Sequence, residues 1–333
     1  MFTKSTILVT GGAGFIGSTL VDKLLDLGNN VIVLDNFNDY YDPNLKKNNI
    51  SQAQKNQNYK LYVGDIEKIH DIEQVFQENK INSIVHLAAR AGVRSSIEMP
   101  LAYAMTNIIG TLNILEMMRK YNVKRMCIAS SSSVYGNCTA DKFSEDLNIR
   151  KPISPYAATK LANEQICYTY HHLYGLEIYL LRFFTVYGPR QRPDLAINKF
   201  TRLIMEDKPI DMYGDSLTVR DYTYIDDIVD GVISSLNYHQ TKYEIFNLGG
   251  GSPITLKAMI AAIEQELNKK AKINKLPPQK GDVNKTVADI SKARRLLHFE
   301  PHTSFKDGIH KFIEWIREVE NPTFGNTTEF TPK

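Results

Sequence analysis

The chain has 333 residues, with 40 lysines and arginines against 37 aspartates and glutamates, and therefore a formal net charge of +3. Because acidic and basic residues are mixed along the chain, we expect neither a nucleic-acid-binding nor a membrane-binding surface. No apolar run approaches the ~20 residues that a membrane span requires. The first apolar stretch leads directly into a glycine-rich turn, unlike a signal peptide. The length predicts a soluble protein with two lobes.

The first predicted elements form a nucleotide-binding unit. The apolar run TILVT, residues 6–10, is typical of a buried parallel strand. Gly11, Gly14 and Gly17 follow in a turn that enters an amphipathic helix. Small residues there let the backbone approach a pyrophosphate, and the start of the helix offers amides and a positive dipole end. The next strand ends at Asp35, which suits the ribose hydroxyls of NAD and repels the extra phosphate of NADP.

Strands and helices then alternate, which is typical of βαβ units and predicts an α/β fold with a doubly wound parallel sheet. A ligand should bind between two lobes, at the carboxyl ends of the strands. Prolines 189 and 193 mark a boundary. We expect a nucleotide-binding domain in residues 1–188, joined by a returning helix and strand at about 222–250, and a second domain in 189–221 and 251–325. The strands expected in the first domain include KLYVGD, SIVHLAA, RMCIASS, YLLRFFTVYG and EIFNLGG.

Tyr156 and Lys160 stand four residues apart in YAATK, a spacing that places both side chains on one face of a helix. The ammonium can favour phenolate and lower the phenol pKa, normally roughly 10, which would make tyrosine a base near neutral pH. Tyr238 and Lys242 repeat the spacing, but they lack a preceding serine strand, and we expect them to be surface residues.

A run of hydroxyls, Ser131 to Ser133, follows a predicted strand and can bind a substrate hydroxyl or carboxylate. The motifs TGGAGFIG, HLAA, SSSSVYG, YAATK and RDYTYIDD together resemble the extended short-chain dehydrogenase/reductase family, in its nucleotide-sugar subgroup. DNFNDYYDPNLK, AGVRSSIEMP, RFFTVYGPRQRPDLAINKF and QKGDV look most like UDP-glucuronate 4-epimerases. The resemblance covers nearly the whole chain. It implies a tightly held NAD, an N-terminal Rossmann lobe, a smaller C-terminal lobe for the UDP-sugar, and a homodimer.

The resemblance also implies roles for particular residues. Tyr156 would be the general base, Lys160 would bind the nicotinamide ribose, and Ser131 would share the proton at the sugar 4-hydroxyl. The matching cofactor positions are Gly11, Gly14, Phe15, Ile16, Gly17, Asp35, Asn36, Asp65, Ile66, Leu87, Ala88 and Ala89. The matching substrate positions are Ser131, Ser132, Ser133, Thr185, Lys199, Arg220, Gln279 and Asp282, and Arg192, with Arg94 as a weaker candidate, could hold the uronate carboxylate.

The expected reaction oxidises the sugar 4-hydroxyl to a ketone and returns the hydride to the opposite face. Binding energy therefore belongs on the UDP group, so that the ketosugar can turn over. A 4-keto uronate can lose carbon dioxide unless its carboxylate is held out of alignment with the carbonyl π system. Related dehydratases place Asp-Glu where this chain has Ser132 and Ser133, so elimination lacks its groups. Decarboxylation to a UDP-pentose, epimerisation of UDP-glucose or UDP-N-acetylglucosamine, and a non-catalytic NAD-binding regulator stay open.

Other reactive residues have plainer explanations. Cys127, Cys138 and Cys167 show no CxxC or metal-site spacing, which favours reduced packing residues in a cytoplasmic protein. His86 closes a predicted strand, where we expect a local hydrogen bond. The other histidines form no HExxH pattern, so no metal site is expected.

Overall fold

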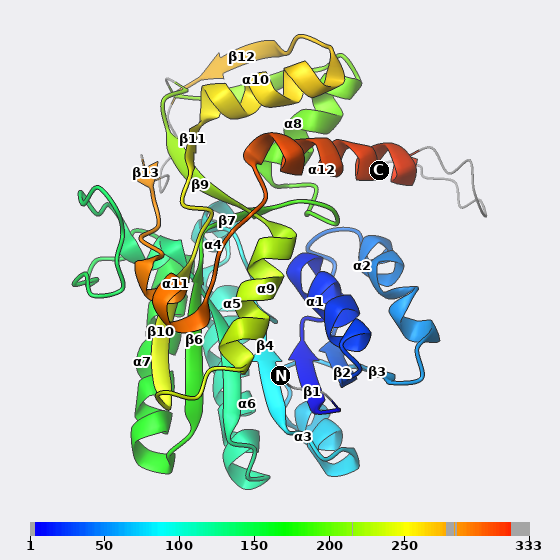
Figure 1. Ribbon diagram of the computed structural model, residues 1–333, viewed down its shortest axis with the longest axis vertical. Helices are drawn as coiled ribbons and strands as arrows, with labels where there is room; N and C mark the ends of the chain where they lie inside the picture. Colours follow the sequence, from blue (N-terminus) through cyan, green and yellow to red (C-terminus); the bar gives the residue numbers. More distant parts are fainter. Residues whose placement is uncertain (1–3, 215, 278–282, 284, 321–333) are drawn as a thin grey trace.

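The computed structural model describes residues 4–214, 216–277, 283 and 285–320. Its largest sheet has seven strands in the order β10-β6-β5-β4-β1-β2-β3, and every pairing in it is parallel (Figure 1). The predicted doubly wound sheet is confirmed. Its strands are β1 (Thr6–Thr10), β2 (Asn30–Asp35), β3 (Tyr59–Val63), β4 (Ser83–His86), β5 (Arg125–Ser131), β6 (Glu177–Phe183) and β10 (Tyr243–Leu248).

Helices cover both faces of this sheet because successive strand residues point to opposite sides. Ile7 and Val9 of β1 join one apolar cluster with α1 (Phe15–Asp26) and α9 (Ile225–Leu236). Leu8 joins the other cluster with residues of the helices α3, α6 and α7. The remaining helices of this lobe are α2 (Pro43–Ile50), α3 (Ile69–Glu78), α4 (Val93–Glu98), α5 (Pro100–Tyr103), the π-helix Ala104–Ile109, α6 (Gly110–Lys120) and α7 (Pro155–Tyr174).

A smaller α/β lobe lies at the top of Figure 1 and is built around β9 (Val219–Tyr224). Strand β9 pairs with β7 (Thr185–Tyr187) and β13 (Lys285–Thr286) in parallel, and with β11 (Pro253–Thr255) in antiparallel orientation. A separate pair joins β8 (Pro209–Tyr213) to β12 (Lys272–Leu276). The helices are α8 (Ala196–Met205), α10 (Leu256–Leu267) and α12 (Phe305–Glu320), while α11 (Ser291–Leu297) packs beside β10.

Two local predictions need correction. YLLRFFTVYG was expected as one strand, but it forms the end of β6 and all of β7, which belong to different sheets. The break is at Phe184, whose amide donates to the Leu248 carbonyl, and the next residue, Thr185, pairs with Tyr222 of the smaller lobe. The returning helix, expected over the whole of DYTYIDDIVDGVISSL, begins only at Ile225, because the preceding residues belong to β9. The exact division of the chain into domains stays a prediction.

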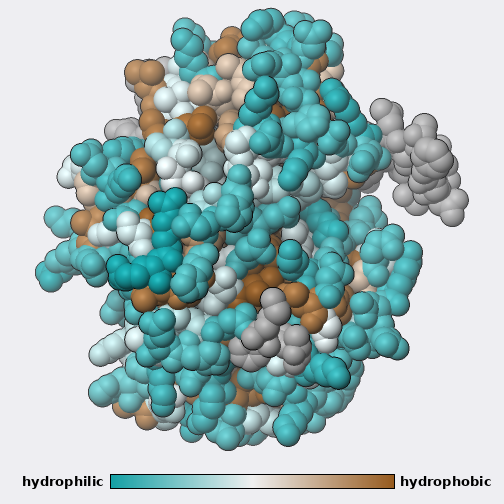
Figure 2. Space-filling model, in the orientation of Figure 1, coloured by the Kyte–Doolittle hydropathy of each residue, from teal (hydrophilic) through white to brown (hydrophobic). Residues whose placement is uncertain are grey.

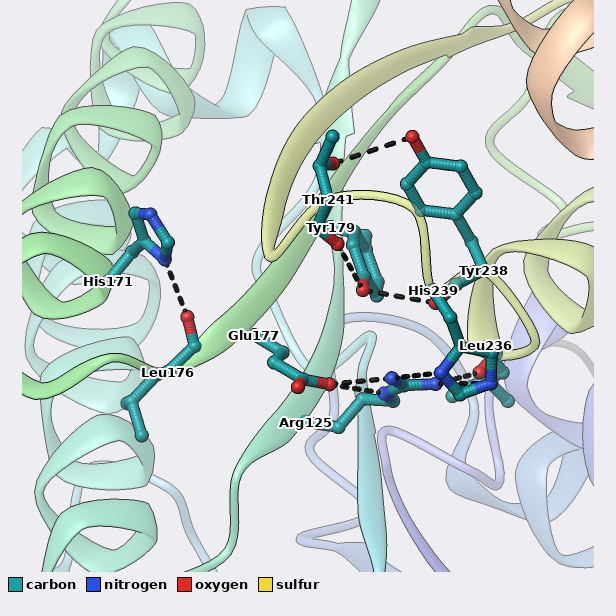
Figure 3. Close-up of polar contacts among 9 residues, drawn as sticks. All are labelled: Arg125, His171, Leu176, Glu177, Tyr179, Leu236, Tyr238, His239 and Thr241. Carbon is teal, nitrogen blue, oxygen red and sulfur yellow. Dashed lines mark hydrogen bonds and ion pairs between the residues drawn. The ribbon is translucent and has the colours of Figure 1, made fainter.

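At the amino-terminal edge of the sheet, Arg125 of β5 joins three neighbouring segments, as Figure 3 shows. Its guanidinium donates to the Glu177 carboxylate at 2.6 and 2.9 Å, to the Leu236 carbonyl at 2.8 Å and to the His239 ring at 2.7 Å. The prediction that Tyr238 lies on the surface is wrong. Its ring is buried, with edge-on contacts to Tyr179 and Phe246, because the loop after α9 folds back under the sheet.

Hydrophilic residues cover most of the face drawn in Figure 2, and apolar ones appear there in small areas. Within the described part of the chain, we find no helix with both the length and the apolar character that a membrane crossing requires.

Candidate active site

The glycine turn packs against the end of a neighbouring strand. Gly11 has a positive φ of 71°, and a Cβ there would lie 2.7 Å from the Ala88 amide nitrogen, just after β4. A Cβ on Gly17 would lie 2.1 Å from the Gly11 carbonyl oxygen. Any side chain at these positions would force the turn apart, so glycine is required for the geometry. Leu87 and Ala88, which pack against this turn, are held in place because their amides donate to the carbonyl and the hydroxyl of Thr10.

Helix α1 starts directly behind this turn. Gly14 is its N-cap and provides no side-chain cap, so no side chain of the cap covers the amides of Phe15, Ile16 and Gly17. The first amides of a helix and its dipole together attract phosphate. The turn therefore has the shape and the donors that a dinucleotide pyrophosphate requires.

Two carboxylates lie at the ends of the next strands. Asp35 closes β2 and accepts hydrogen bonds from the amides of Ala13, at 3.0 Å, and Phe37, at 2.9 Å. Asn36 donates to the Asp65 carboxylate at 2.9 Å, after β3. Ile66 lies in the buried core beside it. The Asp35 carboxylate, so close to the glycine turn, suits a ribose diol and repels a 2′-phosphate. These residues therefore fit NAD.

Helix α7 carries the predicted base. Ser154 caps it by accepting from the Ala157 amide, and Pro155 occupies the first turn, where its missing N–H has no cost. Tyr156 and Lys160 share one face of the helix. The Lys160 ammonium is buried and donates to the Ala129 carbonyl of β5 at 2.8 Å. Ser131 lies close enough to Tyr156 to lower the pKa of the phenol. The structure therefore brings the three predicted catalytic residues together.

The electrostatics of this group differ from the prediction. Burial raises the pKa of Tyr156, and the hydrogen bond with Ser131 and the charge of Arg192 offset only part of that rise. Burial also lowers the pKa of Lys160 to about 8. The prediction that the Lys160 ammonium would lower the phenol pKa is therefore not met in this structure, because burial raises that pKa by more than the neighbouring groups lower it.

The serine segment closes the site at the end of β5. Ser131 accepts from the Ser133 amide at 3.2 Å and donates to the Ser133 hydroxyl at 3.1 Å. Ser132 begins a short 3₁₀ turn, Ser132–Tyr135, that directs the chain away from the sheet. The hydroxyls thus cluster beside Tyr156.

Arg192 lies at the lobe boundary, close enough to Tyr156 for its charge to lower the phenol pKa. Its guanidinium makes two hydrogen bonds with the Asp194 carboxylate, at 2.9 and 2.7 Å, and lies over the Tyr40 ring at 5.1 Å. The Tyr40 hydroxyl is 2.8 Å from that of Ser95. Sequence reasoning missed this tyrosine contact, since nothing in the local pattern pairs residue 40 with residue 192.

A second missed residue is Lys46 of α2. Its ammonium is buried and donates to the carbonyl and the side chain of Asn38, at 2.9 and 3.1 Å. Burial lowers the pKa of Lys46, and the charge of Asp35 opposes that change. The sequence did not indicate that this lysine faces the loop after β2, because it lies in a polar helix whose composition predicts an exposed surface.

The other substrate candidates lie farther along the chain. Arg94 lies in α4, and its guanidinium is 5.1 Å from the centroid of the Tyr213 ring in the smaller lobe. Thr185 starts β7, and Lys199 lies exposed on α8. Arg220 lies in β9 and pairs in register with the buried Thr286. Gln279 and Asp282 lie outside the described residues.

The expected plain roles are confirmed for His86 and for two of the cysteines. The His86 ring lies between the hydroxyls of Thr10 and Thr111, at 2.7 and 3.1 Å, and burial lowers its pKa to about 3. Cys127 and Cys167 are buried free thiols, whereas Cys138 is partly exposed. Within the described ranges, no group of three or more metal-ligating side chains is present.

Comparison with known proteins agrees with this geometry. The family model described as GDP-mannose 4,6 dehydratase matches residues 8–312. A UDP-glucuronate 4-epimerase of Thermodesulfobacterium geofontis is 47% identical over 312 residues, covering 93% of this chain and 96% of that protein. UDP-glucuronate 4-epimerase 4 of Arabidopsis thaliana is 41% identical over 327 residues, covering 93% of this chain and 75% of the plant protein.

Solved structures give the same result. The UDP-glucuronic acid 4-epimerase of Bacillus cereus, in complex with UDP-glucuronic acid and NAD, matches with a TM-score of 0.88 and 37% identity, over 94% of this chain and 99% of that one. The UDP-glucose 4-epimerase of Thermotoga maritima, with UDP-glucose, matches with a TM-score of 0.87 and 34% identity, over 95% and 100%. The chain therefore belongs to the GDP-mannose 4,6 dehydratase family of nucleotide-sugar enzymes and is an extended short-chain dehydrogenase/reductase of the epimerase type.

Proposed function

We propose that this chain interconverts UDP-glucuronate and UDP-galacturonate by NAD-dependent 4-epimerisation. The observation that carries the proposal is the proximity of Ser131 to Tyr156, at the same edge of the parallel sheet as a glycine turn that fits a dinucleotide. Relatives named UDP-glucuronate 4-epimerase, at 47% and 41% identity, indicate the substrate.

The cofactor would lie along the carboxyl edge of the sheet. Gly11, Gly14 and Gly17, with the amides of Phe15 and Ile16, would hold its pyrophosphate, and Asp35 and Asn36 a ribose. Asp65 and Ile66 would flank the adenine, and Leu87, Ala88 and Ala89 the diphosphate. NAD bound there supplies a positively charged ring that accepts a hydride and later returns it.

The chain's own residues would move the proton. Tyr156 takes it from the sugar 4-hydroxyl as carbon 4 is oxidised, and Ser131 shares that proton through its hydroxyl. Lys160 holds the nicotinamide ribose. Because burial raises the Tyr156 pKa, a positive charge near the phenol is required to make it a base near neutral pH. Arg192 already provides part of that charge.

The substrate would span the two lobes. Arg220, Lys199, Gln279 and Asp282 are the proposed UDP contacts, from the segments assigned to residues 189–221 and 251–325. Thr185, Ser132 and Ser133 are the proposed sugar contacts. Arg192 is the better candidate for the uronate carboxylate, because its guanidinium lies close enough to Tyr156 for its charge to lower the phenol pKa. Arg94, with its guanidinium over Tyr213, is the second candidate.

The test is to give the purified protein UDP-glucuronate without added NAD and to follow the sugar by NMR. Formation of UDP-galacturonate supports the proposal. A UDP-pentose would instead indicate decarboxylation, and conversion of UDP-glucose alone would refute the substrate assignment, since a UDP-glucose 4-epimerase is a similar structural relative. Turnover of no UDP-sugar would favour a non-catalytic NAD-binding regulator.

The role of Arg192 has its own test. Arg192→Ala should increase the share of UDP-pentose in the product, because the carboxylate is then less well held away from the carbonyl π system. Lys257→Ala, which removes a cation from an exposed position of α10 with no proposed substrate contact, is the control for lost charge. Unchanged affinity and an unchanged product ratio in Arg192→Ala would contradict the assignment.

A homodimer in the cytoplasm, serving polysaccharide biosynthesis, is part of the same proposal. Leu101 is 81% exposed on α5, and Met105 and Ile109 are exposed on the π-helix that follows. Such an apolar row favours a protein contact. Analytical ultracentrifugation that finds a monomer at micromolar concentration would refute the dimer.

A further inference from the structure

Helix α7 is joined to three consecutive residues at the end of β5. Lys160 donates to the Ala129 carbonyl, and Ser131 lies close enough to Tyr156 to lower the pKa of the phenol. Between them, the Ser130 hydroxyl donates to the carboxylate of Glu164 at 2.6 Å. Tyr156, Lys160 and Glu164 recur every four residues and therefore share one face of the helix. The third of these side chains has no part in the chemistry described above.

Glu164 is paired with Arg182 of β6 in one of the most buried ion pairs of the described chain. The side chains are 1% and 3% exposed, and the guanidinium makes two hydrogen bonds with the carboxylate, at 2.9 and 2.7 Å. Desolvation of two charges costs about as much as their attraction returns, so such a pair is weak evidence for stability. A buried ion pair beside a catalytic helix is better explained by the geometry that it fixes.

The pair belongs to a polar row across the sheet. Ser130 of β5, Arg182 of β6 and Asn247 of β10 are register partners on three adjacent strands. Arg182 also donates to the Tyr135 hydroxyl at 2.9 Å, which in turn donates to Asn247 at 2.7 Å. The neighbouring positions on β6 and β10 are apolar and buried, and the polar side chains of the row are hydrogen-bonded to other polar groups.

This polar row includes residues on both sides of the serine segment, Ser131 to Ser133. Ser130 precedes Ser131, and Tyr135 ends the 3₁₀ turn that contains Ser132 and Ser133. Both residues are attached to the same ion pair, Ser130 through Glu164 and Tyr135 through Arg182. Glu164 and Arg182 therefore restrain the serine segment next to Tyr156.

We propose that Glu164, through Ser130 and Arg182, is a positioning residue that keeps the Ser131 hydroxyl in contact with the Tyr156 phenol during the reaction. This inference rests on the proposed function. Glu164 touches neither substrate nor cofactor in this account. Its effect is transmitted because α7 and β5 cannot slide past each other while the Ser130–Glu164 hydrogen bond is intact.

The variant that isolates this effect is Ser130→Ala, which removes one hydroxyl and leaves the ion pair in place. Loss of geometry at the reacting group should reduce kcat by about tenfold or more, while KM for UDP-glucuronate stays within about twofold, because UDP binds in the other lobe. Ser130→Thr restores a hydroxyl and should recover most of kcat. Ser235→Ala is the matched control, since Ser235 is a buried serine of α9 that donates to the Gly231 carbonyl at 2.8 Å.

A purely structural role predicts a different result. Ser130→Ala would then lower the melting temperature, while kcat per folded molecule would match the wild type, and that outcome overturns the inference. Glu164→Gln combined with Arg182→Met removes both charges and tests the pair itself. If that double variant does not fold, Ser130→Ala and its Thr rescue still decide the question.

A crystal structure of Ser130→Ala makes the test independent of the substrate. The distance from the Ser131 hydroxyl to the Tyr156 hydroxyl should be longer in the variant than in the wild type. An unchanged distance overturns the inference, even if the wild type epimerises UDP-glucuronate. If instead the wild type converts no UDP-sugar and the distance changes, the proposed function fails and the positioning role stands.

Discussion

Replacing Asp221 by asparagine should change how the stability of the protein depends on pH. Asp221 is fully buried in β9, and its carboxylate accepts hydrogen bonds from the amides of Gly250, Gly251 and Ala288, at 2.8, 3.1 and 2.9 Å. It therefore joins β9 to the glycine turn after β10 and to the segment after β13. Burial raises its pKa from the ordinary value of 3.8 to about 6, against the effect of these three amides.

The size and sign of the effect follow from this pKa. A rise from 3.8 to about 6 corresponds to about 3 kcal/mol of proton-linked stability. Because the folded pKa is raised, the folded state binds the proton more tightly than the unfolded state. The contribution is complete below pH 3.8 and is lost as the pH rises through about 6. The amide that replaces the carboxylate in Asp221→Asn does not titrate, so the variant lacks this contribution at every pH.

The assay is urea unfolding of the wild type and Asp221→Asn at several values between about pH 4 and 7. The free energy of unfolding of the wild type should gain up to about 3 kcal/mol relative to the variant as the pH falls across this range. Asp230→Asn, at an exposed position of α9, is the control for removal of one negative charge. Parallel pH curves for the wild type and Asp221→Asn would refute the reasoning.

Three further predictions concern the cofactor turn, the base and the core. Tyr156→Phe should reduce kcat by about 10²–10⁴-fold and leave the amount of bound NAD unchanged. Tyr168→Phe, at an exposed position of the same helix, is the control. A kcat near the wild-type value in Tyr156→Phe would contradict the role of Tyr156. Gly17→Ala should release NAD, measured by chromatography of the denatured protein, because the new methyl would lie 2.1 Å from the Gly11 carbonyl; full occupancy would show that the turn adapts. Phe312→Ala should cost about 3–5 kcal/mol of unfolding free energy, because the ring is fully buried beside Trp315. The fluorescence of Trp315, the only tryptophan, reports this unfolding, and a loss below about 1 kcal/mol would show that the core closes around the gap.

Much of the fold and of the candidate site could be predicted from the sequence, because it depends on interactions between residues close together in the chain. The glycines at 11 and 17 are predictable, because backbone contacts of 2.7 and 2.1 Å exclude any side chain there. The capped start of α7 and the spacing of Tyr156 and Lys160 are equally local, since a helix alone places residues four apart on one face.

The errors came from contacts between distant residues. The burial of Tyr238 depends on Tyr179 and Phe246, which belong to β6 and β10. The split of YLLRFFTVYG into two strands depends on β9, more than 30 residues later in the sequence. The pKa of Tyr156 moved opposite to the prediction because burial, which spacing cannot reveal, opposes the phenolate more strongly than its neighbours favour it.

The sequence by itself determined the parallel α/β sheet, through its alternating strand and helix patterns, and the cofactor turn, through the spacing of its glycines. It also predicted Tyr156 as the base, because helical spacing alone places Tyr156 and Lys160 on one face. Only the tertiary structure decided that Arg192 lies near Tyr156, that Lys46 turns inward to the loop after β2, and that Ser130, Arg182 and Asn247 align across three strands beneath the serine segment. These arrangements depend on strand register and on burial, and both are set when segments far apart in the chain pack together.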